Sequence, residues 1–217
     1  MALVAAGFRL QNAGLTEFQD DEAAILRSAV DMLVNLHLPL TTGRSFSIGI
    51  HEPPLTTFLL AIPALLSRNP LWASFFTGMM DVAAAILVYN SAKRLAGRRA
   101  GLAAGLLYAL APAAIVSSRR LGNPDMLPFF MALALYALIR AVQARSSGWL
   151  ATALVALLFL VQLHPSAGGA LLLWPGAATY FAFRRWALKP GPLLLGVALV
   201  GLATAPYLVL QMQENWS

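Results

Sequence analysis

Three long apolar runs constrain what this chain can fold into. Residues 72–89, 101–116 and 193–210 are long enough, or nearly so, to cross the hydrocarbon core of a bilayer, which takes about 20 helical residues. Apolar residues make up 59% of the chain and charged residues 11%, whereas a soluble domain is roughly 25% charged. The sequence therefore predicts an all-α, polytopic bundle of transmembrane helices, folded as a single domain over residues 1–217.

Basic residues mark one side of the predicted bundle. Segments 93–99, 140–145 and 184–189 hold nine of the 15 Lys and Arg residues and no Asp or Glu. Because Lys and Arg collect in short cytoplasmic loops, we expect all three segments on the cytoplasmic side. An even number of membrane crossings must then separate each basic segment from the next. Two crossings fit between each pair of segments, at 100–117 and 124–139 and at 148–163 and 167–183. In total the sequence predicts about seven spans. The net charge of +6 therefore requires no nucleic-acid partner.

Segment 55–66 is apolar but too short to span a membrane. If it crossed, the next span would leave the basic segment 93–99 on the wrong side. We therefore expect a helix in the outer interface, where apolar segments of about 10–14 residues are plausible. The polar loop 16–54, which holds six of the nine acidic residues, and the connection 117–125 then both face outside.

Both ends of the sequence look cut. Residues 1–10 are too few to span a bilayer, and they contain Arg9. We interpret them as the outer half of a first helix whose start is missing, and the chain as a fragment that also lacks a C-terminal part. The chain has no cysteine, which excludes a disulfide framework and thiolate chemistry.

Asp20, Asp21 and Glu22 open a segment with the pattern of an amphipathic helix, which we expect to lie along the membrane surface. Two interpretations of these acids stay open. Carboxylates in a first helical turn stabilise the helix by about 0.3–1 kcal/mol each. Carboxylates held at a boundary between water and lipid can also take part in chemistry.

A second candidate group ends the outer loop. His51 and Glu52 precede Pro53 and Pro54, and two prolines fix the backbone and prevent a helix before Leu55. The pair is therefore either part of a stiff connector or a rigidly presented part of a site. Together with the acidic residues near position 21 it could hold a divalent metal, but no dense ligand spacing supports one.

The connection 117–125 carries Arg119 and Arg120 on the side where basic residues are unexpected. Guanidinium groups bind phosphate through several donors at once, so a phosphate site is one interpretation. The other is a surface pair between Arg120 and Asp125, which would contribute little to stability.

Asp81 lies about ten residues into its predicted span, near the middle of the membrane at about 1.5 Å per residue. An ionisable group at that depth is a functional candidate by default. No cationic partner is evident within the spans, so we interpret Asp81 as a hydrogen-bonded packing residue. Two weaker features are Gly101 with Gly105, a small-residue packing motif, and His164 before Pro165, which marks the outer turn of a helical hairpin.

The order of these motifs resembles the N-terminal half of the GT-C glycosyltransferases, the superfamily of protein O-mannosyltransferases and bacterial lipid A aminoarabinose or sugar transferases. Asp21 with Glu22 looks like the Asp-Glu motif of the first outer loop. The sequence from His51 to Leu55 is similar to the family's His-Pro-Pro-Leu, with Glu52 as an insertion or replacement.

Further motifs extend this resemblance over nearly the whole chain. Ser118 and Arg119–Arg120 with Asp125 look like the Ser-Arg…Asp of the second outer loop, and Arg120 has the matching spacing. The end of the span at 89–97 and the hairpin at 162–166, which contains His164, are also similar to family segments.

The resemblance implies sugar transfer from a polyprenyl-phosphate donor at the outer face of the plasma membrane, without a cofactor. Asp21 would be the catalytic base, with Glu22 or Asp20 orienting the acceptor, which is a lipid, glycan or protein. Arg120 with Arg119 would bind the donor phosphate. The residues that would position the substrates are His51, Glu52, Asp125 and His164.

Two rival interpretations remain at this point. The chain is a non-catalytic membrane carrier or lipid-binding assembly protein with Asp81 as its key residue, or an inactive fragment of the same fold. A carrier should line a path with polar groups through several spans. The predicted spans contain few polar side chains apart from Asp81, Asn90 and Gln162, and this favours chemistry at the interface over transport.

Overall fold

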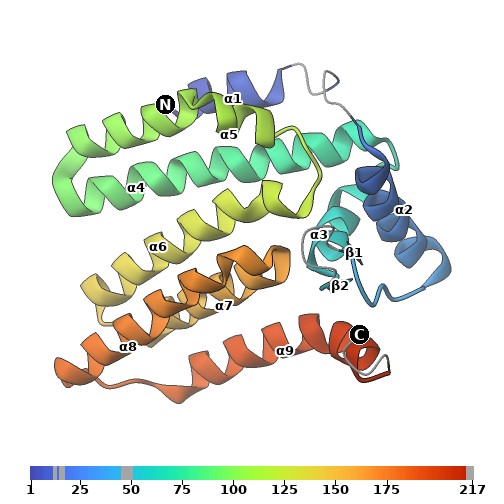
Figure 1. The fold of residues 1–217 in the computed structure, drawn as a ribbon. Coiled ribbons are helices and arrows are strands. Elements are labelled where there is room, and N and C mark those ends of the chain that lie inside the picture. Colours follow the sequence, from blue (N-terminus) through green and yellow to red (C-terminus); the bar gives the residue numbers. More distant parts are fainter. Residues whose placement is uncertain (12–13, 15–17, 45–50, 214–217) are drawn as a thin grey trace.

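The computed structural model describes residues 1–11, 14, 18–44 and 51–213, and it confirms the all-α prediction. Within these residues the only sheet is the two-residue antiparallel pairing of β1 (Gly43–Arg44) with β2 (His51–Glu52). Figure 1 shows the long helices side by side as a bundle, with a smaller group of elements covering one end. The helices of the bundle are α1 (Ala2–Leu10), α4 (Pro70–Leu110), α5 (Pro112–Ser117), α6 (Leu127–Ala144), α7 (Ser147–Leu163), α8 (Leu173–Phe183) and α9 (Pro190–Gln213).

The smaller group contains α2 (Asp20–Asn35), the β1–β2 pair and α3 (Leu55–Ala64), which lie together at one end of the bundle (Figure 1). Two helices were expected in this part of the chain, and both are present. Helix α2 begins at the acidic residues, and α3 begins directly after the two prolines. Their placement at the membrane interface remains a prediction.

Helix α4 is a hairpin of two antiparallel legs. Gly97 breaks the helix with a φ of 87°, a backbone conformation that glycine adopts without steric cost. A Cβ added at Gly101 would lie 2.8 Å from the carbonyl oxygen of Tyr89, so the two legs touch there through the absent side chain. Gly105 packs against Tyr89 in the same way. The prediction that Gly101 and Gly105 form a helix-packing motif is therefore confirmed.

The count of about seven spans is not confirmed. Within the described residues three helical stretches are long and apolar enough to cross a membrane, Pro70–Leu110, Asn123–Ala144 and Pro190–Gln213. The sequence pattern did not reveal several interruptions. Pro112 separates α5 from α4, because proline has no N–H to continue a helix. The predicted span 167–183 is divided between the 3-10 helix η3 (Pro165–Leu172) and the 11-residue α8.

A buried ion pair attaches α1 to both legs of α4. The Nε of Arg9 donates to Asp81, and the two terminal nitrogens of Arg9 donate to the carbonyl oxygens of Ala109 and Tyr108 at 2.8 and 3.1 Å. The hydroxyl of Tyr108 donates to the other carboxylate oxygen of Asp81. The interpretation of Asp81 as a hydrogen-bonded packing residue is therefore confirmed. The expectation that it has no cationic partner is wrong, because α1 packs beside α4 and supplies Arg9 (Figure 1).

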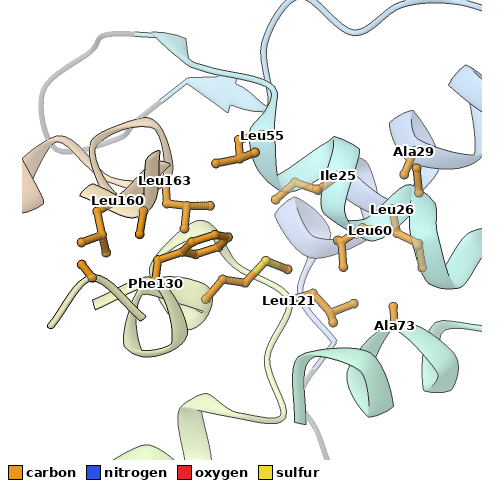
Figure 2. Close-up of a cluster of buried hydrophobic side chains, with 14 of the residues drawn as sticks. Ile25, Leu26, Ala29, Leu55, Leu60, Ala73, Leu121, Phe130, Leu160 and Leu163 are labelled. Carbon is orange, nitrogen blue, oxygen red and sulfur yellow. The ribbon is translucent and has the colours of Figure 1, made fainter. Parts of the chain in front are cut away.

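A hydrophobic core joins the smaller group to the bundle. Figure 2 shows Ile25 and Leu26 of α2, Leu55 and Leu60 of α3, and Phe130, Leu160 and Leu163 of α6 and α7 around Leu121. Leu60, Leu121 and Leu163 are fully buried. Burial of a leucine side chain contributes about 1.5–3 kcal/mol. This packing therefore fixes α2, α3 and the connection before α6 against one another.

Candidate active site

The connection between α5 and α6, residues 117–126, is held in a compact shape by its own side chains. It ends in the 3-10 helix η2 (Asn123–Met126). Oδ1 of Asp125 accepts a hydrogen bond from the Ser117 hydroxyl at 2.5 Å, and Oδ2 accepts one from the Gly122 N–H at 3.1 Å. Asp125 thus closes the connection on itself, and we call residues 117–126 the site loop.

Glu22 links α2 to the site loop. Its Oε1 accepts a hydrogen bond from the backbone N–H of Leu121 at 3.1 Å, and its Oε2 accepts one from the N–H of Gln19 at 3.3 Å. The second bond belongs to a capping box at the start of α2. Glu22 is 3% exposed, so its charge is stabilised by these donors instead of water. Its carboxylate also lies close enough to Asp125 to interact with it electrostatically.

Glu52 also contacts the site loop, from β2. The side-chain amide of Asn123 donates to Oε2 of Glu52. Two hydrogen bonds from Thr42 fix the backbone around Glu52. The N–H of Thr42 donates to the carbonyl oxygen of Glu52 at 2.9 Å, and the hydroxyl of Thr42 donates to the carbonyl oxygen of Pro53 at 2.7 Å. The structure therefore shows a fixed backbone at Glu52, which fits both a stiff connector and a rigidly presented part of a site.

The two arginines of the site loop have different surroundings. Nη2 of Arg119 donates to the carbonyl oxygen of Phe8 at 2.9 Å, which ties the loop to the end of α1. Arg120 is half-buried and interacts electrostatically with Asp125. Within the described part of the chain the guanidinium of Arg120 forms no hydrogen bond and no ion pair, although the backbone N–H of Arg120 donates to the carbonyl oxygen of Ser117 at 3.0 Å. Its guanidinium therefore keeps its donors available for a ligand.

Asp20 and Asp21 are exposed in the first turn of α2, beside Glu22. Oδ1 of Asp21 accepts a hydrogen bond from the N–H of Glu22 at 2.9 Å, which leaves its second oxygen on the surface. The three acids thus differ in their surroundings. Glu22 is built into the structure, whereas Asp20 and Asp21 are accessible to a substrate.

His164 lies at the end of α7, which packs against α3 and η2. Its Nδ1 is 2.7 Å from the Ser166 hydroxyl, so its ring is engaged in the turn that begins η3. The described residues contain no group of three or more His, Cys, Asp or Glu side chains that could hold a metal ion.

Sequence reasoning missed the partners of the charged residues. Asn123, Ser117 and Gln19 hold Glu52, Asp125 and Glu22 in place. Ser117 lies near Asp125 in the sequence, and Gln19 occupies the N-cap position that precedes Glu22 by three residues, so both carried a local signal. Asn123 carried no local signal, because its partner Glu52 lies 71 residues away in the sequence.

Comparison with known proteins supplies the family. A family model described as dolichyl-phosphate-mannose-protein mannosyltransferase matches residues 51–210, which run from His51 through the site loop and His164 into α9. No curated protein and no solved structure matches the chain. The match agrees with the resemblance seen in the motifs, and members of this family use a lipid-linked sugar donor in a membrane. The chain belongs to the dolichyl-phosphate-mannose-protein mannosyltransferase family of membrane glycosyltransferases, which is of the GT-C type.

Proposed function

We propose that this protein transfers a sugar from a polyprenyl-phosphate donor to an acceptor hydroxyl at the outer face of the plasma membrane. One observation carries the proposal: carboxylates from three separate elements gather at the site loop, beside an arginine with unused donors. These carboxylates are Glu22 of α2, Glu52 of β2 and Asp125 of η2, and the arginine is Arg120.

Arg120 binds the donor phosphate in this proposal. When the bond between the anomeric carbon and the phosphate oxygen breaks, negative charge grows on the phosphate, and a guanidinium can stabilise it with two parallel hydrogen bonds. The polyprenyl phosphate leaves as an anion, so no general acid is required. Arg119 supports this clamp by tying the loop to α1, and its buried Nε has no partner in the described structure.

Asp21 is the proposed base. The acceptor oxygen attacks the anomeric carbon from the face opposite the phosphate, so the transfer inverts the anomeric centre. The acceptor proton passes to the Asp21 carboxylate. The exposed position of Asp21 supports this role, because an acceptor can reach its free oxygen. Asp20 lies in the same turn and orients the acceptor.

The remaining site residues position the substrates. Glu22, Glu52 and Asp125 hold the site loop in contact with α2 and β2, and so set where Arg120 lies relative to Asp21. His51 precedes Glu52 in the same fixed strand and faces the donor head group in this proposal. His164, at the end of α7, is a further residue that positions a substrate.

A carrier with Asp81 as its key residue has less support. Asp81 is 4% exposed, and both its oxygens are bonded, to Arg9 and Tyr108. A carboxylate occupied in this way offers no binding site for a transported solute or ion.

The test is sugar transfer from a polyprenyl-phosphate donor by membranes that contain the protein. Asp21→Asn removes the base with almost no change in volume, and we expect turnover to fall by about 10²–10⁴-fold, the usual contribution of general base catalysis. Asp31→Asn on the same helix is the matched control and should keep wild-type turnover. Equal turnover of Asp21→Asn and the control, at equal abundance in the membrane, would contradict the assignment.

A further inference from the structure

The end of the bundle opposite the site loop carries a dense group of cations. The turn of α4, the α6–α7 connection and the α8–α9 connection all lie at this end (Figure 1). We call these residues the basic end: Lys93, Arg94, Arg98, Arg99, Arg140, Arg145, Arg184, Arg185 and Lys189. All of them except the half-buried Arg140 are exposed.

No acidic side chain from the neighbouring sequence neutralises these charges. Residues 82–124 and 126–213 contain no Asp or Glu, and these two stretches include all three connections. A protein surface without a binding role usually carries positive and negative side chains interspersed. An uncompensated group of this size indicates an anionic partner.

Aromatic rings fix the orientation of several guanidinium groups. The Cζ atoms of Arg145 and Arg184 lie 5.1 and 5.8 Å from the ring centroid of Trp186. Trp186 in turn packs edge-on against the fully buried Phe181, with the ring centroids 5.1 Å apart. Two cations from different connections are thus held at one ring, where both can reach the same phosphate group.

Hydrogen bonds join the three connections. The guanidinium of Arg94 donates to the side chain of Gln143, whose amide donates back to the Arg94 carbonyl oxygen, both at 3.3 Å. The N–H of Lys189 donates to the hydroxyl of Ser147 at 2.8 Å. The basic end is therefore one connected surface, because each connection is bonded to a neighbour.

Exposed apolar side chains stand among the cations. Leu95 is 70% exposed and Phe183 is 82% exposed. A surface that combines cations with exposed apolar side chains at the ends of apolar helices suits the boundary between lipid head groups and acyl chains. A nucleic acid or a soluble acidic protein would leave these apolar side chains in water.

We propose that the basic end binds the head groups of anionic phospholipids in the adjoining leaflet, with Arg145 and Arg184 at Trp186 as the principal phosphate clamp. This binding is separate from sugar transfer and does not depend on it. It uses the end of the bundle that the proposed active site does not occupy.

The experiment measures retention of phospholipid by the purified protein. The full chain is placed in nanodiscs of phosphatidylcholine with or without phosphatidylglycerol, and the bound lipids are compared by native mass spectrometry. Arg145→Gln with Arg184→Gln removes the clamp. Arg27→Gln with Arg68→Gln removes two exposed arginines of α2 and the α3–α4 connection, with the same change in net charge.

Wild type and the control should prefer phosphatidylglycerol. The clamp variant should lose roughly 30-fold in that preference, because each of the two removed cations contributes about 5-fold near an anionic surface. No preference in the wild-type protein would overturn the proposal. Equal loss in the clamp and control variants would also overturn it, because it would show a general effect of net charge. If the clamp variant is unstable, raising the salt concentration on wild type must weaken the preference, and an unchanged preference would contradict the electrostatic account.

Discussion

Two places in this protein bring an arginine and an aspartate near each other, in opposite surroundings. Arg9 and Asp81 are buried between α1 and α4, and each guanidinium nitrogen and each carboxylate oxygen takes part in a hydrogen bond. Arg120 and Asp125 lie in the site loop, where Asp125 is occupied by Ser117 and Gly122 but Arg120 keeps its donors.

The difference separates charges that hold the fold from charges that are available to a substrate. A buried guanidinium must satisfy its donors within the protein, because an unpaired buried charge is strongly unfavourable. A half-exposed guanidinium can leave its donors to water, which a phosphate can displace. The comparison is therefore consistent with a structural role for Arg9 and with the proposed binding of the donor phosphate by Arg120.

Breaking the buried pair should have the largest effect on stability. Asp81→Leu leaves Arg9 buried without its counter-ion, and we expect the free energy of unfolding to fall by about 3–5 kcal/mol. Replacing both partners, with Arg9→Met and Asp81→Leu, should recover most of that loss, because two apolar side chains need no compensation. Thermal unfolding in detergent measures both variants. Equal stability of Asp81→Leu and wild type would show that the pair is not structural.

Removing the Glu22 side chain should have the next largest effect. Glu22→Ala leaves the N–H of Leu121 buried without an acceptor, and such a group costs about 1–3 kcal/mol. Asp20→Ala, which removes an exposed carboxylate from the same turn, should cost no more than about 0.3–1 kcal/mol. If thermal unfolding ranks the two variants in the opposite order, Glu22 does not anchor the site loop.

Ser117→Ala tests the closure of the site loop at a single hydrogen bond. The hydroxyl of Ser117 donates to Asp125 at 2.5 Å, and its loss should lower the free energy of unfolding by about 1–2 kcal/mol, where the range for ordinary hydrogen bonds meets the range for bonds to charged groups. Denaturant titration measures this change. Ser91→Ala, on the first leg of α4 away from the site loop, is the comparison. A smaller loss in Ser117→Ala than in the comparison would contradict the role of Ser117.

The smallest effect concerns acid stability at the end of α2. Hydrogen bonds from Asn35 and then His37 lower the pKa of Asp31 below its ordinary value. A carboxylate with a lowered pKa stabilises the fold above its unfolded pKa of about 3.9, and this contribution is lost as the pH falls through the lower folded value. The difference in melting temperature between wild type and Asp31→Asn should therefore shrink below about pH 4. A constant difference across that range would contradict the assignment.

Local features of this fold could be predicted from the sequence. The start of α2 at Asp20, the start of α3 after Pro54 and the break in the basic segment at Gly97 follow from helix caps, prolines and charge. The division of segment 167–183 could not be predicted, because its composition is uniformly apolar. The two-residue pairing of β1 with β2 was equally invisible, since strands of two residues are too short to leave an alternating pattern in the sequence.

The residues of the candidate site could be proposed from the sequence, but their hydrogen-bond partners could not. Asp21, Glu22, Glu52 and Arg120 were candidates from their residue types and motifs. The contact of Glu22 with Leu121 joins residues 99 positions apart, and Arg9 meets Asp81 across 72 positions. Such partners are chosen by the packing of whole helices, and a single sequence carries no signal of which distant residue will be adjacent.

The most direct test of the comparison measures turnover and stability together in two variants. Arg120→Lys keeps the charge but loses the planar fork, so sugar transfer per folded molecule should fall substantially while the melting temperature stays near that of wild type. Arg9→Lys should lower the melting temperature and leave transfer per folded molecule unchanged. Wild-type transfer by Arg120→Lys, or a loss of transfer in Arg120→Lys that only follows the amount of folded protein, would contradict the assignment of Arg120 to the donor phosphate.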